Sequence, residues 1–215
     1  MISIASVCYS RQETLNKVLP SWLAQEEVDF EIILGVGPDI VIPNDPRIRT
    51  TRLDSPFNLW RAFNQTMAMS RGDLVVITQS DTLMTSSKLV KTLLNEWKPG
   101  LTVSPICIFD DGRHDDGLHL HCRLLEKSDI FRIGGMFEGF GIGYGYDDDD
   151  FSSNLSELGI KFRVLTPSEC TPVTHLHHPR PNTFDPKIAD SFEKCRKLYY
   201  SRHKFGIKEL VQRQK

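Results

Sequence analysis

The first half of the chain alternates short apolar runs with stretches in which apolar residues recur every three or four positions. The apolar runs predict buried strands over residues 2–9, 30–36, 47–53, 74–77 and 101–108. The periodic stretches predict helices over residues 15–23, 58–70 and 86–97. Pro20 falls inside the first of these helices, so we expect a kink or a late helix start there. Strands separated by helices of this length predict βαβ units and a mainly parallel sheet.

The second half of the chain follows a different pattern. Residues 109–121 are polar and rich in Asp and His, and residues 134–145 contain six glycines. Four consecutive aspartates occupy positions 147–150, and we expect a helix to begin inside this run because carboxylates favour a helix N-terminus. Without an internal repeat or a linker, the two halves are interpreted as lobes of one domain over residues 1–185. A helical tail over residues 186–215 follows it.

Composition narrows the class of protein. The chain has 215 residues, with 40% hydrophobic and 25% charged residues, which excludes wholesale disorder and a coiled coil. No apolar run reaches the roughly 18 residues that a membrane span needs. Five scattered cysteines without a Cys-x-x-Cys pair favour free thiols in a reducing compartment, and we therefore expect a cytoplasmic protein.

The formal net charge of −2 conceals two regions of opposite sign. Residues 194–215 carry eight basic residues and one acid, a net charge of +7, which leaves −9 for residues 1–193. Ile188, Phe192, Cys195 and Tyr199 lie at helical spacing in the same region. A basic amphipathic helix can bind an anionic membrane surface or nucleic-acid phosphates. The favoured alternative is a cap that packs one face on the domain.

Acidic and imidazole side chains point to a cation site. Asp81 directly follows the most hydrophobic strand, where ligands of parallel sheets bind. Together with the aspartates at 147–150 and His175, His177 and His178, it could hold a divalent cation that binds phosphate oxygens. The alternatives are that Asp81 caps the following helix and that the acidic run is a solvated turn.

The glycine-rich segment 134–145 does not match a dinucleotide-binding fingerprint. It does not follow the first strand, and aromatic residues interleave its glycines. This composition is better suited to shaping a pocket against a flat ligand such as a sugar or a base.

Several segments resemble motifs of one known family, and they occur in the same order. Residues 7–11 resemble the opening strand-to-helix motif, and residues 63–77 lead to Gln79-Ser80-Asp81 in place of an Asp-x-Asp motif. Residues 134–138 resemble a Gly-Gly-Phe-Asp-Glu motif, and residues 143–151 resemble a Gly-Trp-Gly-Gly-Glu-Asp-Asp-Asp segment. Residues 174–179 resemble the segment whose late histidine completes a metal site. Together they resemble a GT-A-fold glycosyltransferase of the family-2 kind, with similarity to the carboxyl-terminal domain of β-galactosyltransferases.

The resemblance implies a fold and a reaction. The fold is a single α/β, Rossmann-like GT-A domain with a mainly parallel central sheet flanked by helices and a C-terminal helical tail. Residues 1–108 would form the half that binds the nucleotide sugar, and residues 109–185 the acceptor and catalytic half. The reaction is metal-dependent transfer of a sugar from a nucleotide-sugar donor, with a UDP-linked donor favoured, to an acceptor hydroxyl with inversion.

The resemblance also implies a metal site. Asp81 would coordinate Mn²⁺ or Mg²⁺ bound to the donor diphosphate. His175 would be the late histidine ligand, with His177 or His178 as alternatives.

The resemblance assigns the remaining site residues to catalysis, donor and acceptor. Asp148 would be the general base, and Asp147 would hold the acceptor hydroxyl. The donor side would include Tyr9, Arg11, Asp39, Asn64, Gln79 and Ser80. The acceptor side would include Glu138, Tyr144, Gly145 and Asp149. Glycan, lipid-linked, protein and nucleic-acid acceptors all remain open.

Two departures from the family pattern leave other functions open. Gln79 stands where the first Asp of Asp-x-Asp is expected, and the second strand does not end on an acidic residue, for which Asp39 could substitute. One alternative is therefore a non-catalytic or degenerate protein that binds nucleotide sugars or glycans on the same scaffold. Another is a metallohydrolase that uses the Asp and His residues of 110–121, which are otherwise interpreted as a solvated surface loop.

Overall fold

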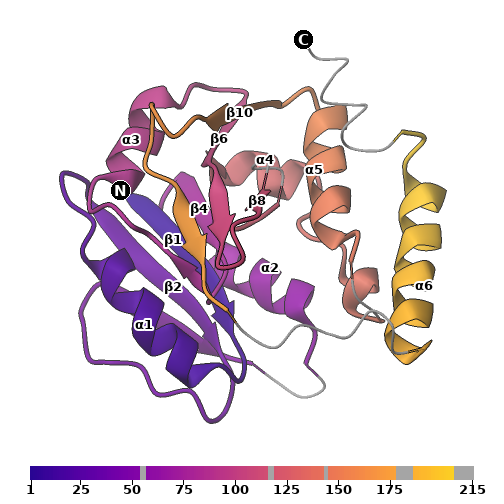
Figure 1. Cartoon of the computed structure of the whole chain (residues 1–215), viewed down its shortest axis with the longest axis horizontal. Helices are drawn as coiled ribbons and strands as arrows, with labels where there is room; N and C mark the ends of the chain where they lie inside the picture. Colours follow the sequence, from indigo (N-terminus) through magenta and orange to yellow (C-terminus); the bar gives the residue numbers. More distant parts are fainter. Residues whose placement is uncertain (54–56, 116–118, 143–144, 178–185, 206–215) are drawn as a thin grey trace.

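The structure is a computed structural model of the whole chain (Figure 1). It describes residues 1–53, 57–115, 119–142, 145–177 and 186–205. A seven-stranded sheet forms its centre, with the strand order β10-β6-β9-β4-β1-β2-β3. The strands are β1 (Ile2–Cys8), β2 (Phe30–Val36), β3 (Ile48–Arg52), β4 (Leu74–Thr78), β6 (Leu101–Pro105), β9 (Cys122–Glu126) and β10 (Lys161–Leu165).

All pairings in this sheet are parallel except those of β9, which runs antiparallel to both of its neighbours, β4 and β6. The predicted α/β architecture with a mainly parallel sheet is therefore confirmed. The carboxyl ends of β1 and β4 lie side by side because these two strands pair in parallel. Ligands of such sheets bind at this edge.

A second, four-stranded sheet carries part of the predicted site. Its order is β5-β11-β7-β8, formed by β5 (Thr82–Leu83), β11 (Val173–His175), β7 (Cys107–Phe109) and β8 (His114–Asp115). The single strand predicted over residues 101–108 is wrong, because β6 and β7 belong to different sheets. The apolar pattern continues across the break at Ile106, and such a pattern does not reveal a change of partner strand.

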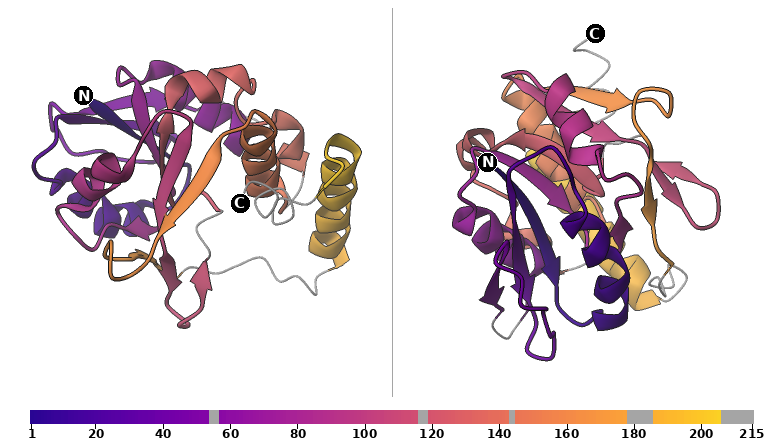
Figure 2. Two further views of the ribbon diagram at one scale, coloured as in Figure 1. Left: turned by 90° about the horizontal axis from the view of Figure 1, so that it is seen from above. Right: turned by 90° about the vertical axis from the view of Figure 1, so that its left-hand side faces the viewer.

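Helices cover both faces of the central sheet (Figures 1 and 2). They are α1 (Gln12–Leu23), α2 (Leu59–Met69), α3 (Leu89–Glu96), α4 (Lys127–Arg132), a 3-10 helix over Glu138–Ile142, α5 (Asp147–Glu157) and α6 (Pro186–Arg202). The late start considered for α1 is wrong, since the helix begins at Gln12 and Pro20 lies in its last turns. Asn58 caps α2, with Oδ1 accepting hydrogen bonds from the N–H groups of Trp60 and Arg61.

Two apolar clusters fill the space between the central sheet and its helices. One joins the sheet to α1 and α3 and includes Trp22, which is fully buried. The other joins it to α2, α5 and α6 and includes Phe63 and Phe151. All five cysteines are free, as the sequence predicts, and the structure buries each of them.

The C-terminal helix α6 stands beside α5 at one edge of the molecule (Figure 2). Cys195 and Tyr199 are completely buried against the second cluster, and the Tyr199 hydroxyl lies 2.7 Å from Ser153 Oγ. The helix therefore packs one face on the domain, as the cap interpretation of the tail predicts. Among the helices of the described ranges, none combines the length and apolar character needed to cross a bilayer.

Candidate active site

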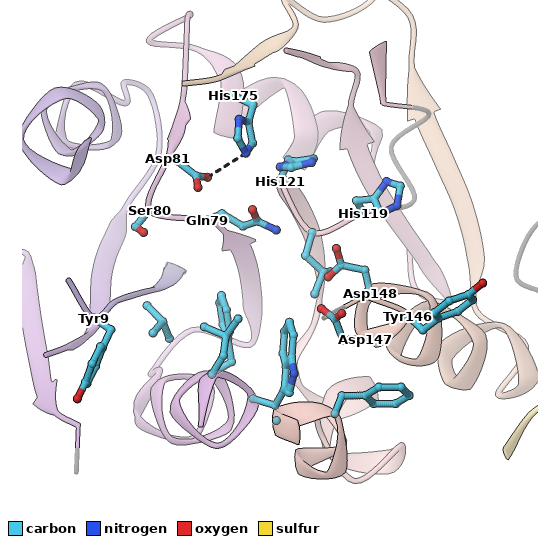
Figure 3. Close-up of a pocket in the computed structure, with 18 of the residues that line it drawn as sticks. Tyr9, Gln79, Ser80, Asp81, His119, His121, Tyr146, Asp147, Asp148 and His175 are labelled. Carbon is cyan, nitrogen blue, oxygen red and sulfur yellow. Dashed lines mark ion pairs between the residues drawn. The ribbon is translucent and has the colours of Figure 1, made fainter. Parts of the chain in front are cut away.

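A cavity of about 950 Å³ opens at the carboxyl ends of β1 and β4 (Figure 3). Its walls come from the β1–α1 connection, α2, the segment after β4, the segment before β9, the 3-10 helix, β11, the first turn of α5 and one side chain of α6. Ten of the residues predicted for the site line it: Tyr9, Arg11, Gln79, Ser80, Asp81, Gly145, Asp147, Asp148, Asp149 and His175.

Asp81 and His175 meet at one wall because their backbones are paired. β11 pairs antiparallel with β5 so that His175 lies opposite Thr82, and the Leu176 N–H donates to the Asp81 carbonyl at 2.8 Å. Both side chains are buried, with His175 Nε2 3.7 Å from Asp81 Oδ1 (Figure 3). The suggestion that Asp81 caps the next helix is wrong, since α3 begins at Leu89 with Lys88 at its N-cap.

This pair fits a divalent cation in part. Donor atoms bind such ions at about 2.0–2.2 Å, so two atoms 3.7 Å apart can share one ion. One carboxylate and one imidazole form a donor set that Mn²⁺ accepts. Across the described ranges, however, no three acidic, histidine or cysteine side chains are already arranged to hold an ion. Asp81 and His175 could therefore supply two ligands, and further ligands would have to come from a bound donor or from a side chain that moves.

Two histidines that the resemblance did not assign also line the pocket. His119 Nδ1 lies 2.5 Å from Oδ1 of the buried Asp115, and His121 Nε2 lies 3.9 Å from Oδ2 of the same carboxylate. The hydrogen bond to Asp115 raises the pKa of His119 to about 9, whereas burial lowers the pKa of His121 to about 4. At pH 7 the pocket therefore holds one cationic and one neutral imidazole on the same segment.

The interpretation of residues 110–121 as a solvated loop is wrong for Asp115 and His121, which are buried. The alternation of histidine and apolar residues over 119–122 was the sequence signal for a strand entering the core. Asp110, Asp111 and His114 point to solvent instead, and Asp116 lies outside the described residues. Among the described residues of this segment, Asp115, His119 and His121 therefore lie together at the pocket, and the three exposed side chains do not join them.

The four consecutive aspartates divide between two roles because α5 begins at the first of them. Asp147, Asp148 and Asp149 line the pocket, and Figure 3 places the carboxyls of Asp147 and Asp148 across it from Asp81. Asp150 turns away, because each helical residue advances by about 100°. Its buried carboxylate binds Arg202 at 2.6 Å and His203 at 2.8 Å.

Electrostatics distinguish Asp147 and Asp148 from ordinary surface carboxyls. The pKa of each is raised, mainly because the surrounding protein displaces water from the charged form. The Asp148 carboxylate further raises the pKa of Asp147, while the cationic His119 and Arg123 oppose the rise at Asp148. The two carboxyls titrate as a pair and can hold and accept a proton near neutral pH.

Asn64 and Gly135 show how the glycine-rich segment is held. The Asn64 side chain donates to the Met136 carbonyl and accepts from the Met136 N–H, both at 2.8 Å. Gly135 has φ +77°, and a Cβ there would lie 2.5 Å from Asn64 Oδ1. Asn64 thus contacts the backbone of this segment and does not line the cavity.

Three other predicted residues lie away from the cavity. Asp39 lines a separate hollow near α1, and Glu138 is paired with Arg61 at 2.9 Å. His177 is exposed and lies 2.8 Å from Asp110. Tyr144 and His178 lie outside the described residues.

Comparison with known proteins identifies the fold. No protein-family model matches the sequence, and no curated protein matches it. A solved structure, the mannosyltransferase PcManGT from Pyrobaculum calidifontis in complex with GDP-Man and Mn²⁺, matches with a TM-score of 0.62 and 14% sequence identity. The match covers 84% of this chain and 58% of that chain. The chain therefore has a GT-A-type glycosyltransferase fold and spans a little over half of its structural neighbour.

Proposed function

We propose that this chain is a glycosyltransferase that moves a sugar from a nucleotide-sugar donor to an acceptor hydroxyl with the help of Mn²⁺ or Mg²⁺. The main support for this proposal is the arrangement of side chains in the pocket. Asp81 and His175 form one wall, and the paired carboxyls of Asp147 and Asp148 lie across the cavity. A cation beside the departing diphosphate and a proton acceptor across the cavity would together suit transfer of a sugar to a hydroxyl.

The donor side is formed by Asp81, His175 and the β1–α1 connection. Asp81 and His175 would hold the cation, which when bound offsets the negative charge that develops on the departing diphosphate. Tyr9 lines the pocket and stacks on Phe57 with ring centres 4.1 Å apart, which supports its proposed role beside the nucleotide. Gln79 and Ser80 complete this side. The resemblance favours a UDP-linked donor, while the structural neighbour binds GDP-Man, so both bases belong in any test.

The acceptor side is formed by the first turn of α5. Asp148 would remove the proton of the attacking hydroxyl, a contribution of about 10²–10⁴-fold for a general base. Asp147 would hold that hydroxyl, and its raised pKa suits it to donate or accept a hydrogen bond. One displacement at the anomeric carbon inverts its configuration. Tyr144, Gly145 and Asp149 remain the proposed acceptor contacts, whereas Glu138 is paired with Arg61 away from the cavity.

A thermal-shift screen of nucleotide sugars tests the proposal. The purified chain is heated with a panel of UDP- and GDP-sugars, in Mn²⁺, in Mg²⁺ and in chelator. A ligand present at 100 times its Kd stabilises the folded state by about 2.7 kcal/mol. In a chain of this size, that corresponds to a rise in Tm of roughly 5–10 °C. We expect such a shift for a subset of donors and only with the cation. Stabilisation by none of the donors would contradict the proposal.

A non-catalytic binding protein is the second candidate, and Gln79 favours it because one carboxylate of the expected motif is missing. Turnover separates the two. Release of nucleoside diphosphate from the stabilising donor in the presence of Mn²⁺ would support the enzyme. Tight donor binding with no release, with or without a panel of glycan acceptors, would support the binding protein.

A further inference from the structure

The cation site proposed above has two protein ligands, Asp81 and His175. A third ligand is expected at position 79, where the residue differs from the family pattern. Gln79 carries an amide where the resemblance expects a carboxylate. Antiparallel pairing of β4 with β9 places Thr78 opposite Cys122, and the Thr78 hydroxyl donates to the His121 carbonyl at 2.7 Å. The ladder ends at this pair, and Gln79 and His121 are the residues next to it on the two segments. Both line the pocket, so an imidazole lies in the same cavity as the altered position.

The His121 ring is buried beside the cation-binding wall. The residue is only 8% exposed, and its ring centre lies 5.1 Å from that of His175, with the ring planes at 89° (Figure 3). Two imidazoles that bind one ion at about 2.1 Å have ring centres roughly 5 Å apart. The spacing of the two rings therefore already suits a shared ion.

The nitrogens of His121 are not engaged in strong contacts. Its Nδ1 is buried without a hydrogen-bond partner among the described residues. Its Nε2 lies 3.9 Å from Asp115 Oδ2, too far for a hydrogen bond. A buried polar atom without a partner costs free energy, which a ligand would recover. A rotation of this side chain toward the pocket would break no hydrogen bond that the described residues make with either nitrogen.

We propose that His121 is a third protein ligand of the cation held by Asp81 and His175, and that it replaces the carboxylate missing at Gln79. This inference rests on the proposed function, since it concerns the same cation. It also specifies the class of ion. One carboxylate and two imidazoles favour transition ions such as Mn²⁺ or Co²⁺, whereas Mg²⁺ prefers an all-oxygen shell.

Titration of the protein with Mn²⁺ alone tests the ligand set, with free Mn²⁺ followed by its electron paramagnetic resonance signal. We expect His121→Ala to weaken Mn²⁺ binding by about 10-fold or more, while weak Mg²⁺ binding, measured by competition, changes little. His121→Asp should restore Mn²⁺ binding and strengthen Mg²⁺ binding. His177→Ala is the matched control, because that histidine is exposed and lies close to His175 in sequence. Thermal unfolding in chelator verifies that each variant is folded.

The outcomes separate this inference from the proposed function. If Asp81→Asn abolishes Mn²⁺ binding while His121→Ala stays within twofold of wild type, His121 is not a ligand and the proposed cation site stands. If the wild-type chain binds no Mn²⁺ on its own, the inference fails, and the nucleotide-sugar screen then decides the proposed function. If His121→Ala does not fold, His121→Asp is compared with His121→Asn instead. The inference would be overturned if His121→Asp binds Mn²⁺ no more tightly than His121→Asn.

Discussion

The guanidinium of Arg11 lies 2.7 Å from the carboxylate of Asp81, inside the pocket and beside the proposed cation. Asp81 is almost completely buried, whereas Arg11 is partly exposed to the cavity. The guanidinium binds Asp81 Oδ2, whereas His175 faces Oδ1, so the proposed cation would use the other oxygen of the same carboxylate. The arginine and the cation would then place two positive charges on one carboxylate and repel each other, and a bound diphosphate would give the guanidinium a new partner.

Removal of this positive charge should strengthen binding of the ion. We predict that Arg11→Ala binds Mn²⁺ several-fold more tightly than wild type in the absence of donor, measured by Mn²⁺ titration. The same variant should bind the nucleotide-sugar donor more weakly, because the diphosphate loses a positively charged contact. Arg47→Ala, which removes a surface pair with Asp45, is the control. Unchanged or weaker Mn²⁺ binding by Arg11→Ala would count against repulsion at Asp81.

Asp148→Asn should stop sugar transfer and leave donor binding intact. The substitution keeps the shape of the side chain but removes the proton acceptor, so turnover should fall by about 10²–10⁴-fold. Calorimetric titration of the donor in Mn²⁺ should give a Kd within a few-fold of wild type. Asp190→Asn on the exposed face of α6 should retain full turnover. Near-normal turnover by Asp148→Asn would remove Asp148 from the role of base.

The raised pKa of Asp147 and Asp148 predicts a dependence of stability on pH. Ordinary carboxyls ionise near pH 4, so in the unfolded chain both groups lose their protons there. In the folded chain they retain protons to higher pH, since burial and mutual repulsion raise the pKa of both. The folded state then binds more protons than the unfolded state, and this contribution to stability falls as pH rises above 4.

The double variant Asp147→Asn and Asp148→Asn removes this penalty. Its free energy of unfolding, measured in urea, should exceed that of wild type at pH 8, and the difference should shrink toward pH 4. A difference that is the same at both pH values would show that the two carboxyls are not destabilised by burial.

In wild type, turnover should rise with pH through the weakly acidic range, as the base loses its proton.

Asp150 predicts a stability effect without a direct role in transfer. Its carboxylate joins α5 to Arg202 and His203 at the end of α6, and it is completely buried. Asp150→Ala removes the partner of the buried His203 Nε2, while Glu157 still contacts Nδ1 at 2.9 Å. Removing one partner of a buried ion pair costs about 3–5 kcal/mol. Urea unfolding should detect a loss of this size, whereas Asp190→Ala on the surface of α6 should change stability by less than about 0.5 kcal/mol. Equal stabilities would mean that α6 is not anchored through Asp150.

Apolar periodicity predicts the first half of the fold well and the second half poorly, for reasons visible in single residues. β9 carries Arg123 as its second residue, which breaks the apolar pattern although the side chain is fully buried. Its guanidinium donates to Ser152 Oγ at 2.8 Å and lies over the ring of Phe162. The hydrogen bond to Ser152 offsets part of the cost of burying Arg123. Ser152 lies 29 residues away in the sequence, so a pattern of neighbouring residues does not reveal it.

The candidate site, too, is predicted only in part by local sequence patterns. The position of Asp81 after an apolar strand predicts its place at the sheet edge, and that local signal was sufficient. The proximity of His121 to Gln79 and His175 depends on the register of two separate sheets, which sequence spacing does not determine. The sequence also does not show which of the four aspartates face the pocket, because the direction of the Asp150 side chain depends on where α5 begins.

Calorimetric titration of the stabilising nucleotide sugar, with Mn²⁺ and with chelator, tests the central proposal most directly when wild type and Asp81→Asn are compared. We predict that wild type binds the donor only with Mn²⁺ and that Asp81→Asn binds it at least tenfold more weakly. Donor binding that is equally tight in chelator and in the variant would contradict a cation site at Asp81. No binding of any nucleotide sugar would contradict the proposed function itself.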